Sequence, residues 1–586
     1  MTSGGPPKFP ENTDPAELGF RMRRAMVRWF SPRLLAATAV RVGFAGVFGS
    51  YSDKREIEAA LPAGGLPSYA RRRELWIDYV ADLGDAFGTV YSVASLLAEE
   101  SLVVGERNGP SFATKRGNIL VFGGDEVYPT PSVDAYTDRT AGPYEAALPY
   151  TTRNHPHLYA VPGNHDWYDG LTSFLRVFCR KQWIGGWQTH QTRSYFALEL
   201  HRRWWLWGID IQLDVSIDEP QLEYFRRAAE KLTPRDAVIL CSALPSWVFS
   251  NQDDPEAYSK LDYFERKIIR PTGARVALSL TGDKHHYARY EAIGGSWQKI
   301  TAGGGGAYTS GTHSLPEMLV LPPEESKDKK KTDPPETYYR RKVFPDERTS
   351  RRRRWFAFFL PFRNPSFAAL VGAVHLLFIG LVQAALRAER ESFRDMMARL
   401  PFRSVAWGFV RSPLAILVAL VIVYGFVGFT RSGVWWKRAI GAFHGLAHLA
   451  AVIFWIGAVR LALHSVESAA LYLLLFLFAT AVGGGLVGSW VLAFYLAQAD
   501  RVRLNSNELF AAQRMRTYKN FLRLHIDKDG VLTIYPIGLR KTSRVWTLRE
   551  GGDPLSAWFT PKRPLSPELI EAPITVDPYK GRRPAS

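Results

Sequence analysis

The sequence predicts a layered α/β domain, followed by four membrane-crossing helices and a small C-terminal region that contains β-structure. In the first three-fifths of the chain, short apolar β-type runs alternate with mixed polar stretches, which is typical of α/β layers. After that the composition changes to long apolar stretches with almost no charge. The predicted strands are Asn118–Gly123, His157–Val161, Trp204–Ile211, Ala237–Cys241 and Ala274–Leu280.

The chain has 586 residues, too many for one ordinary domain. We expect a polar tail and helical lead-in (1–67), the α/β domain (71–316), a basic linker (324–354), four transmembrane helices (365–497) and a C-terminal region (505–586). No periodic apolar face appears in the linker, so we expect it to be largely disordered or loosely helical. In the C-terminal region, Phe521–Ile526 and Val531–Ile537 flank a turn and predict a β-hairpin.

Four long apolar stretches predict the membrane helices. They are Pro365–Leu386, Pro413–Phe429, Ala439–Val459 and Ala469–Leu496. Each is near the length that crosses about 30 Å of hydrocarbon, and four such runs in succession are rare in soluble proteins. Basic segments precede the first helix, join the second helix to the third, and follow the fourth helix. All of them fall on one side of the membrane, which the positive-inside rule makes the cytoplasmic side. Arg387–Arg411 also carries arginines but falls outside. We therefore expect a plasma (inner) membrane protein with its α/β domain and C-terminus in the cytoplasm.

Composition narrows the partner classes. The chain has 74 Lys+Arg against 56 Asp+Glu, a net charge of +18 that suits an anionic partner. Much of the excess lies in the linker and around the apolar stretches, and no basic-aromatic stripe appears in the α/β region, which argues against nucleic acid. Two cysteines, Cys179 and Cys241, can form neither a disulfide framework nor a Cys-rich zinc site. The N-terminus opens with a polar tail and does not resemble a secretory signal. The first apolar run, Leu34–Tyr51, is too short and interrupted to span a bilayer, and it fits a helix packed on the protein or lying at the membrane surface.

Acidic, amide and imidazole side chains follow three predicted strands, each after a Gly that permits a sharp turn. They are Asp125, then Asn164, His165 and Asp166, and then Asp283, His285 and His286. The carboxyl ends of strands in an open α/β sheet converge on one crevice. Three such ends with oxygen and nitrogen donors therefore predict a metal-binding crevice.

These blocks resemble the calcineurin-like metallophosphoesterase superfamily, and within it a membrane-associated branch with a C-terminal transmembrane region. The blocks read Asp82-Leu83-Gly84-Asp85, Gly123-Gly124-Asp125-Glu126-Val127-Tyr128-Pro129, Gly163-Asn164-His165-Asp166-Trp167 and Gly282-Asp283-Lys284-His285-His286-Tyr287. The likeness covers about 76–313. It implies a four-layer β-sandwich flanked by helices, and hydrolysis of a phosphate ester or pyrophosphate by a metal-activated water.

The resemblance also implies a site for two divalent ions. Asp125 is the implied bridge between the two ions. Asp82, helped by Asp85, and His285 would bind one ion, and Asn164 and Asp283 would bind the other. Two divalent ions about 4 Å apart would neutralise the phosphate and lower the pKa of a bound water. Mixed carboxylate and imidazole ligands suit Mn²⁺, Fe or Zn²⁺ better than Ca²⁺.

Three further histidines have implied roles. His165 would protonate the leaving oxygen, and His286 or His313 could contact phosphate or metal. Two positions depart from the superfamily pattern. Gly84 stands where the first block commonly has His, and Ala243 stands where a fourth block supplies His, so one ion would hold fewer protein ligands.

The expected partners are a phosphorylated substrate, membrane-proximal or lipid-linked, and the lipid bilayer. The alternative is a non-catalytic metallophosphoesterase-fold module that binds a ligand and acts as a sensor coupled to the membrane helices. A transporter with a regulatory phosphoesterase is a third hypothesis, which only His444 and His448 favour. These two share a helix face at i and i+4, which suggests either interhelical hydrogen bonding, the interpretation we favour, or a metal or proton site.

Overall fold

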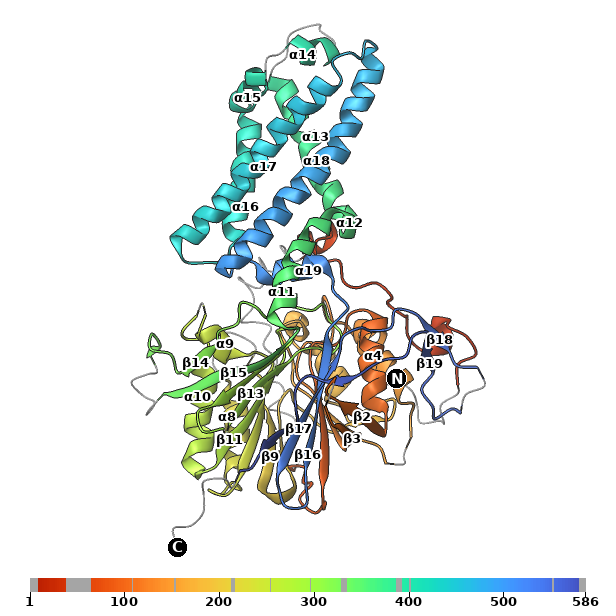
Figure 1. The fold of residues 1–586 in the computed structure, drawn as a ribbon, viewed down its shortest axis with the longest axis vertical. Helices are drawn as coiled ribbons and strands as arrows, with labels where there is room; N and C mark the ends of the chain where they lie inside the picture. Colours follow the sequence, from red (N-terminus) through yellow and green to blue (C-terminus); the bar gives the residue numbers. More distant parts are fainter. Residues whose placement is uncertain are drawn as a thin grey trace. The chain divides into compact units, whose positions relative to one another are not determined.

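The structure is a computed structural model that describes residues 9–37, 65–107, 109–151, 154–211, 217–252, 254–295, 297–327, 335–385, 393–399, 402–550 and 553–578. The chain forms two compact units (Figure 1). The α/β unit contains 1–27, 48–347 and 515–586, and the helical unit contains 28–47 and 348–514.

The first sheet of the α/β unit has the order β20-β17-β16-β1-β4-β5-β7-β6, and β21 also pairs with β17. Its strands are β1 (Leu75–Val80), β4 (Ile119–Phe122), β5 (His157–Ala160), β6 (Trp183–Ile184), β7 (Trp187–Thr189), β16 (Lys519–Ile526), β17 (Leu532–Leu539), β20 (Glu568–Leu569) and β21 (Ile574–Val576). Strands β1, β4 and β5 run parallel to one another, so their carboxyl ends meet at one edge of the sheet.

The second sheet has the order β14-β15-β12-β13-β11-β10-β9-β8. Its strands are β8 (Phe196–Glu199), β9 (Trp204–Gly208), β10 (Ala237–Cys241), β11 (Arg275–Thr281), β12 (Tyr287–Ala292), β13 (Gln298–Ala302), β14 (Met318–Leu321) and β15 (Glu336–Phe344). Strands β9, β10, β11 and β13 are parallel. All five strands predicted from the sequence are confirmed, each within a few residues of its expected limits.

Apolar side chains from both sheets form one shared core, which includes Ile77 and Val121 from the first sheet and Ile239 and Leu280 from the second. The other face of the first sheet packs against α4 (Phe87–Ala98), α6 (Gly142–Ala147) and α7 (Thr172–Phe178). The other face of the second sheet packs against α8 (Glu219–Ala229) and α10 (Ser259–Phe264). The unit therefore has helix, sheet, sheet and helix layers, and strands buried on both faces explain the continuous apolar runs.

The C-terminal β-hairpin is confirmed as β16 and β17, but it belongs to the first sheet. β16 pairs antiparallel with β1, with Arg523 opposite Asp78. These two side chains are buried and form an ion pair of 3.1 Å between Arg523 Nε and Asp78 Oδ1. A segment more than 400 residues downstream of β1 thus completes the sheet that carries the site.

The expectation of a disordered or loosely helical linker is wrong for its described residues. β15 lies between β12 and β14, and α11 (Glu347–Arg353) follows it. The strand escapes sequence analysis because its apolar signal is short and its basic side chains are paired. Arg341 Nε, for example, lies 2.7 Å from Glu291 Oε2 of β12.

Among its described residues, the helical unit contains three helices long and apolar enough to cross a membrane, not four. They are α13 (Pro365–Ala385), α17 (Trp435–Ala462) and α18 (Ala469–Ala499), and the shorter helices include α12 (Leu360–Arg363), α14 (Phe393–Arg399), α15 (Phe402–Arg411), α16 (Pro413–Phe429) and α19 (Ser506–Gln513). The predicted second span is α16, which has only 17 residues and a length of about 26 Å at 1.5 Å per residue. Most of the run Leu34–Tyr51 lies outside the described residues.

Candidate metal centre

Three strand ends bring the candidate ligands together. Asp82 follows β1, Asp125 follows β4, and His285 follows β11 of the second sheet. The backbone turns sharply here. The φ angles are positive at Asp82, Asp125 and Asp283, with values of 59°, 55° and 61°. Residues other than glycine rarely adopt such backbone angles, and those that do are often found at functional sites. Asp82 N donates to Gly124 O at 2.9 Å, which ties the first two loops together.

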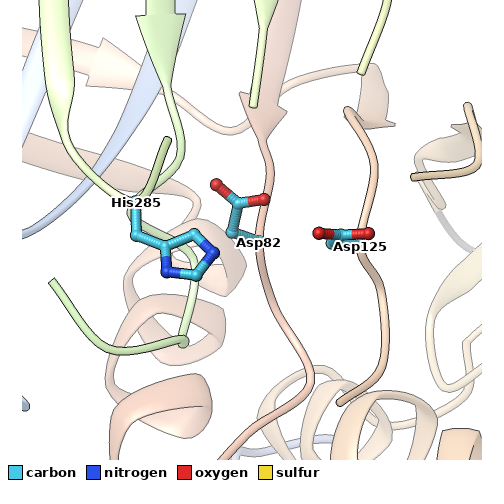
Figure 2. A group of neighbouring side chains, drawn as sticks. All are labelled: Asp82, Asp125 and His285. Atoms are coloured by element: carbon cyan, nitrogen blue, oxygen red, sulfur yellow. The ribbon is translucent and has the colours of Figure 1, made fainter. Parts of the chain in front are cut away.

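Asp82, Asp125 and His285 are buried, and one ligand atom of each lies within 4.8 Å of the others (Figure 2). Two carboxylates and one imidazole form a donor set that suits a transition-metal ion. Asp82 Oδ2 is buried and has no hydrogen-bond partner among the described residues. A buried acceptor without a donor is costly, and a bound cation would satisfy it. The three residues therefore fit a metal ion.

The hydroxyl of Tyr128 lies at the centre of this triad. Its oxygen is 3.3 Å from Asp82 Oδ1, 3.0 Å from Asp125 Oδ2 and 3.0 Å from His285 Nε2. A single hydroxyl proton can serve only one of these three acceptors at a time. Tyr128 belongs to the second sequence block, yet it was not predicted as a site residue. Its position makes it a further group that could contact a bound ion.

The amide of Asn164 also faces the triad. Its side-chain nitrogen donates to both carboxylate oxygens of Asp125, at 3.2 and 3.1 Å, and its oxygen accepts a hydrogen bond of 3.3 Å from the Tyr168 hydroxyl. Asn164 therefore holds the Asp125 carboxylate. Its implied role as an oxygen ligand would require the amide to turn over.

With protein groups alone around them, the three triad side chains favour their neutral forms. Burial, followed by the nearby Asp125 and Asp283 carboxyls, raises the pKa of Asp82 well above its usual value. Burial and neighbouring carboxyls likewise raise the pKa of Asp125. Burial, followed by the charge of Lys519, lowers the pKa of His285 well below its usual value. A divalent cation would reverse the penalty on both carboxylates, so metal binding should release protons.

Besides Asn164, two of the predicted ligands lie outside the triad, Asp283 and Asp85. Asp283 is partly buried, and its backbone N–H donates to Asp82 Oδ1 at 3.0 Å, so it positions that carboxylate. Asp85 points to another part of the unit. Its Oδ1 accepts a hydrogen bond of 2.7 Å from Val27 N and lies 3.8 Å from Arg139 Nη1. Asp85 therefore fastens the N-terminal segment to the domain.

The predicted histidines His165, His286 and His313 are not members of the triad. His165 N donates to Asp125 Oδ1 at 2.9 Å, and His165 Nδ1 lies 2.8 Å from Pro129 O, which can accept only from a protonated Nδ1. Burial lowers the pKa of His165 to about 4 and that of His286 to about 3. His313 is half-buried on the loop after β13. Protonation of His165 would thus need an anion nearby.

The missing fourth-block histidine has no substitute in the described part of the chain. Ala243 is buried against Gly124, where an added Cβ on the glycine would come within 2.7 Å of Ala243 Cβ. Among the described residues, the only group of three His, Cys, Asp or Glu placed to hold an ion is Asp82, Asp125 and His285. One ion position is therefore much better supplied with ligands than any other.

Glycines form the wall directly behind the carboxylates. A Cβ at Gly303 would lie 2.0 Å from Asp82 Oδ2, and one at Gly163 would lie 2.1 Å from Asp125 Oδ1. Only glycine permits so close an approach of the backbone. The loop after β13 also bonds to the Asp82 turn, since Ala307 N donates to Asp82 O at 3.0 Å.

The start of β16 supports this glycine-containing loop, a contribution that sequence analysis missed. Lys519 is fully buried, and its Nζ donates to Ala307 O and, at 3.0 Å, to Thr309 Oγ1. Asn520 N donates to Gly304 O at 3.2 Å. Burial lowers the pKa of Lys519 to about 7, and Asp85 and Asp82 oppose that shift. No local sequence signal marks Lys519, because its neighbours in space come from distant strands.

Residues 75–287 match the family model of the calcineurin-like phosphoesterases. This part of the chain is thus a calcineurin-like phosphoesterase domain, and it contains the whole triad as well as Tyr128 and Asn164. A search of curated proteins finds no match for the chain.

Proposed function

We propose that this chain is a membrane-anchored, metal-dependent phosphoesterase that hydrolyses a phosphate ester or a pyrophosphate. The observation that carries the proposal is the convergence of Asp82, Asp125 and His285, from three strand ends distant in sequence, within a calcineurin-like phosphoesterase domain. The alternative, a non-catalytic sensor module, draws support from Ala243, which removes one expected ligand.

Asp82, Asp125 and His285 would hold a divalent ion such as Mn²⁺, Fe or Zn²⁺. When bound, such an ion neutralises phosphate oxygens and lowers the pKa of a coordinated water. The protein supplies the remaining functions. Asn164 donates its amide N–H groups to Asp125, and Asp283 N–H donates to the Asp82 carboxylate and fixes it. Asn164, Asp283 and Asp125 would hold a second ion more weakly, because Ala243 removes one expected ligand.

His165 is the proposed acid for the leaving oxygen. Its Nδ1–H is held by Pro129 O, which leaves Nε2 to carry the transferred proton. Burial keeps this ring neutral in the free protein, because its pKa is about 4. An anionic phosphate beside the ring would raise that pKa, so the proposed acid form is favoured only with substrate present. His286 and His313 remain proposed phosphate or metal contacts.

Membrane association is proposed from α13, α17 and α18. Within the helical unit, α13 and α18 are antiparallel, since Gly372 approaches Ala481 and Gly485 approaches Ala368. The start of α13 and the end of α18 therefore share one end of the unit, where Arg354 Nε lies 3.9 Å from Asp500 Oδ2.

Further basic residues gather at the same end. Asn505 Nδ2 donates to Phe429 O at 2.8 Å, which brings the end of α16 and the following 431–438 segment there. Clustered arginines at one end of apolar helices support a cytoplasmic orientation for that end, in the plasma (inner) membrane. Proximity to anionic lipid supports a membrane-proximal or lipid-linked substrate over nucleic acid.

Hydrolysis by the purified full-length chain tests the proposal. In detergent with Mn²⁺, the wild type should hydrolyse generic phosphomonoester or phosphodiester substrates. Asp125→Ala should lose about 100-fold or more, because several kcal/mol of metal stabilisation is removed and each 1.4 kcal/mol is tenfold. Asp529→Ala, at an exposed turn, is the matched control. Equal activity in the wild type and in a folded Asp125→Ala variant would defeat the assignment.

A further inference from the structure

The interior of the helical unit contains three histidines in otherwise apolar surroundings. They are His375 of α13 and His444 and His448 of α17, all buried. Along the described lengths of α13, α16 and α18, and between Arg438 and Arg460 of α17, there is no Asp, Glu, Lys or Arg. Ionisable side chains inside apolar helices are expensive and generally mark a function.

His444 and His448 are bonded to each other, with 3.1 Å between their Nε2 atoms. The ring of His444 stacks on Tyr495 at 3.8 Å, and that of His448 stacks on Phe426 at 4.9 Å. The favoured interpretation from sequence, hydrogen bonding between helices, is not met, because this bond lies within α17. His444 Nδ1 is buried without a partner among the described residues.

His375 approaches the pair from a second helix. Its Nδ1 lies 2.9 Å from Val371 O and must donate to it, which leaves a lone pair on Nε2. That Nε2 is buried and has no partner among the residues described. A Cβ at Gly488 of α18 would lie 3.3 Å from His375 Cε1 and 3.7 Å from His448 Nδ1. The two rings therefore lie at most 7.0 Å apart, on either side of one glycine.

Hydroxyl groups on the buried surface of α18 extend this set in both directions. Tyr495 OH donates to Asn505 Oδ1 at 2.8 Å, toward the basic end of the unit. The hydroxyls of Thr480 and Tyr472, toward the other end, are buried and lack partners among the described residues. Tyr472 and Tyr495 are 23 residues apart on one helix, about 34 Å. That length matches the roughly 30 Å hydrocarbon core of a bilayer.

Unpaired buried polar atoms cost free energy, and native proteins usually satisfy such atoms with internal water. Those in the helical unit include His375 Nε2, His444 Nδ1, Tyr472 OH and Thr480 Oγ1. Together with the histidines, these hydroxyls form a polar column along α18 from Tyr472 to Asn505. The column offers imidazoles and hydroxyls but no carboxylate, so the charge of a divalent ion would stay uncompensated in apolar surroundings. A proton fits better, because an imidazole can accept a proton at one ring nitrogen and release another from its second nitrogen.

We propose that the helical unit conducts protons through this polar column, from Tyr472 to Asn505, with His375, His448 and His444 as the relay. Each step moves one proton between oxygen or nitrogen atoms and involves no oxidation or reduction. The proposal rests on the proposed membrane association, but not on phosphoester hydrolysis. It gives the helical unit a function beyond anchoring the phosphoesterase domain.

Proton flux into proteoliposomes tests it. The full-length chain is reconstituted into phosphatidylcholine–phosphatidylglycerol vesicles that contain a fluorescent pH dye, and valinomycin with a potassium gradient drives protons inward. The wild type should acidify the lumen several-fold faster than protein-free vesicles. His448→Leu and His375→Leu should lower the rate to the protein-free level. The matched control His464→Leu changes an exposed histidine just beyond α17 and should keep the wild-type rate.

Two further variants in the same assay separate proton conduction from hydrolysis and from loss of folding. Asp125→Ala should retain full proton flux, which distinguishes this function from hydrolysis. His448→Gln keeps a hydrogen-bonding side chain but cannot relay a proton, so it should also lose flux even if the Leu variants fail to fold. The proposal is overturned if wild-type flux equals that of protein-free vesicles, or if folded His448→Gln conducts as well as the wild type. Failure of the wild type to float with the vesicles would overturn both this proposal and membrane anchoring.

Discussion

Replacing Lys519 with Met tests whether β16 supports the metal centre. The buried ammonium donates to Ala307 O and Thr309 Oγ1, and Ala307 N in turn donates to Asp82 O. Met has a similar length but no donor, so Lys519→Met leaves two buried acceptors unpaired at about 1–3 kcal/mol each. The loss is partly offset, because burial already lowers the pKa of Lys519 to about 7 and so penalises the charged form.

The net effect on the site should be about 1.4–2.8 kcal/mol, which corresponds to a 10–100-fold weaker metal affinity, the range typical of residues that orient metal ligands. Isothermal titration calorimetry of the metal-free protein with Mn²⁺ measures this change in metal affinity directly. Lys528→Met, at an exposed position of the same hairpin, is the matched control and should bind as the wild type does. If Lys519→Met lowers thermal stability but leaves the Mn²⁺ affinity within twofold of wild type, the reasoning is refuted.

Three other changes separate structural from site residues. Asp85→Ala should lower the free energy of unfolding by about 1–3 kcal/mol, because Val27 N loses its acceptor, yet leave bound metal per chain unchanged; lost metal at unchanged stability would contradict this. Arg523→Met should cost about 3–5 kcal/mol in denaturant unfolding by leaving Asp78 buried and unpaired; a cost below 1 kcal/mol would argue against an integral hairpin. Burial, then His190, lowers the pKa of His157 to about 4, below its usual 6.5. The unfolded chain therefore binds more protons between these values, so stability should fall as pH drops from 6.5 to 4, and less so in His157→Gln; identical pH profiles would refute it.

The strand-end pattern predicts two of the three triad residues, because Asp125 and His285 each follow a predicted strand and a glycine that are adjacent to them in the chain. Asp82 follows a strand that the sequence analysis does not predict, and only the family resemblance implies it as a ligand. The resemblance implies Asp85 in the same way and misplaces it, since one turn can point neighbouring carboxylates in opposite directions. Only tertiary contact with Val27 and Arg139 decides which of them faces the ligand group.

Contributions that come from far along the chain escape this reasoning. Tyr128 lies in a recognised block, but its hydroxyl reaches the triad only because β4 and β11 belong to different sheets that end side by side. β15 carries too many basic side chains to look like a strand, and one of them, Arg341, pairs with Glu291 on β12. For Tyr128 and β15 the deciding information is a partner, not a pattern. The bounds of α16 are those predicted, but its 17 residues are short for a membrane span.

The order of the chain has a consequence for how the site is assembled. Residues 348–514 form the helical unit, and the α/β unit resumes at Met515 with the segment that begins β16. That segment supplies Lys519 and Asn520 to the glycine-containing loop behind Asp82, and Arg523 to Asp78 of β1. The phosphoesterase domain at 75–287 therefore lacks a central strand of its own sheet until the helical unit has been synthesised. A buried Asp78 without Arg523 would be strongly destabilising, so the metal centre reaches its final form only once the segment from Met515 onward, which follows the apolar helices in the chain, has packed against β1.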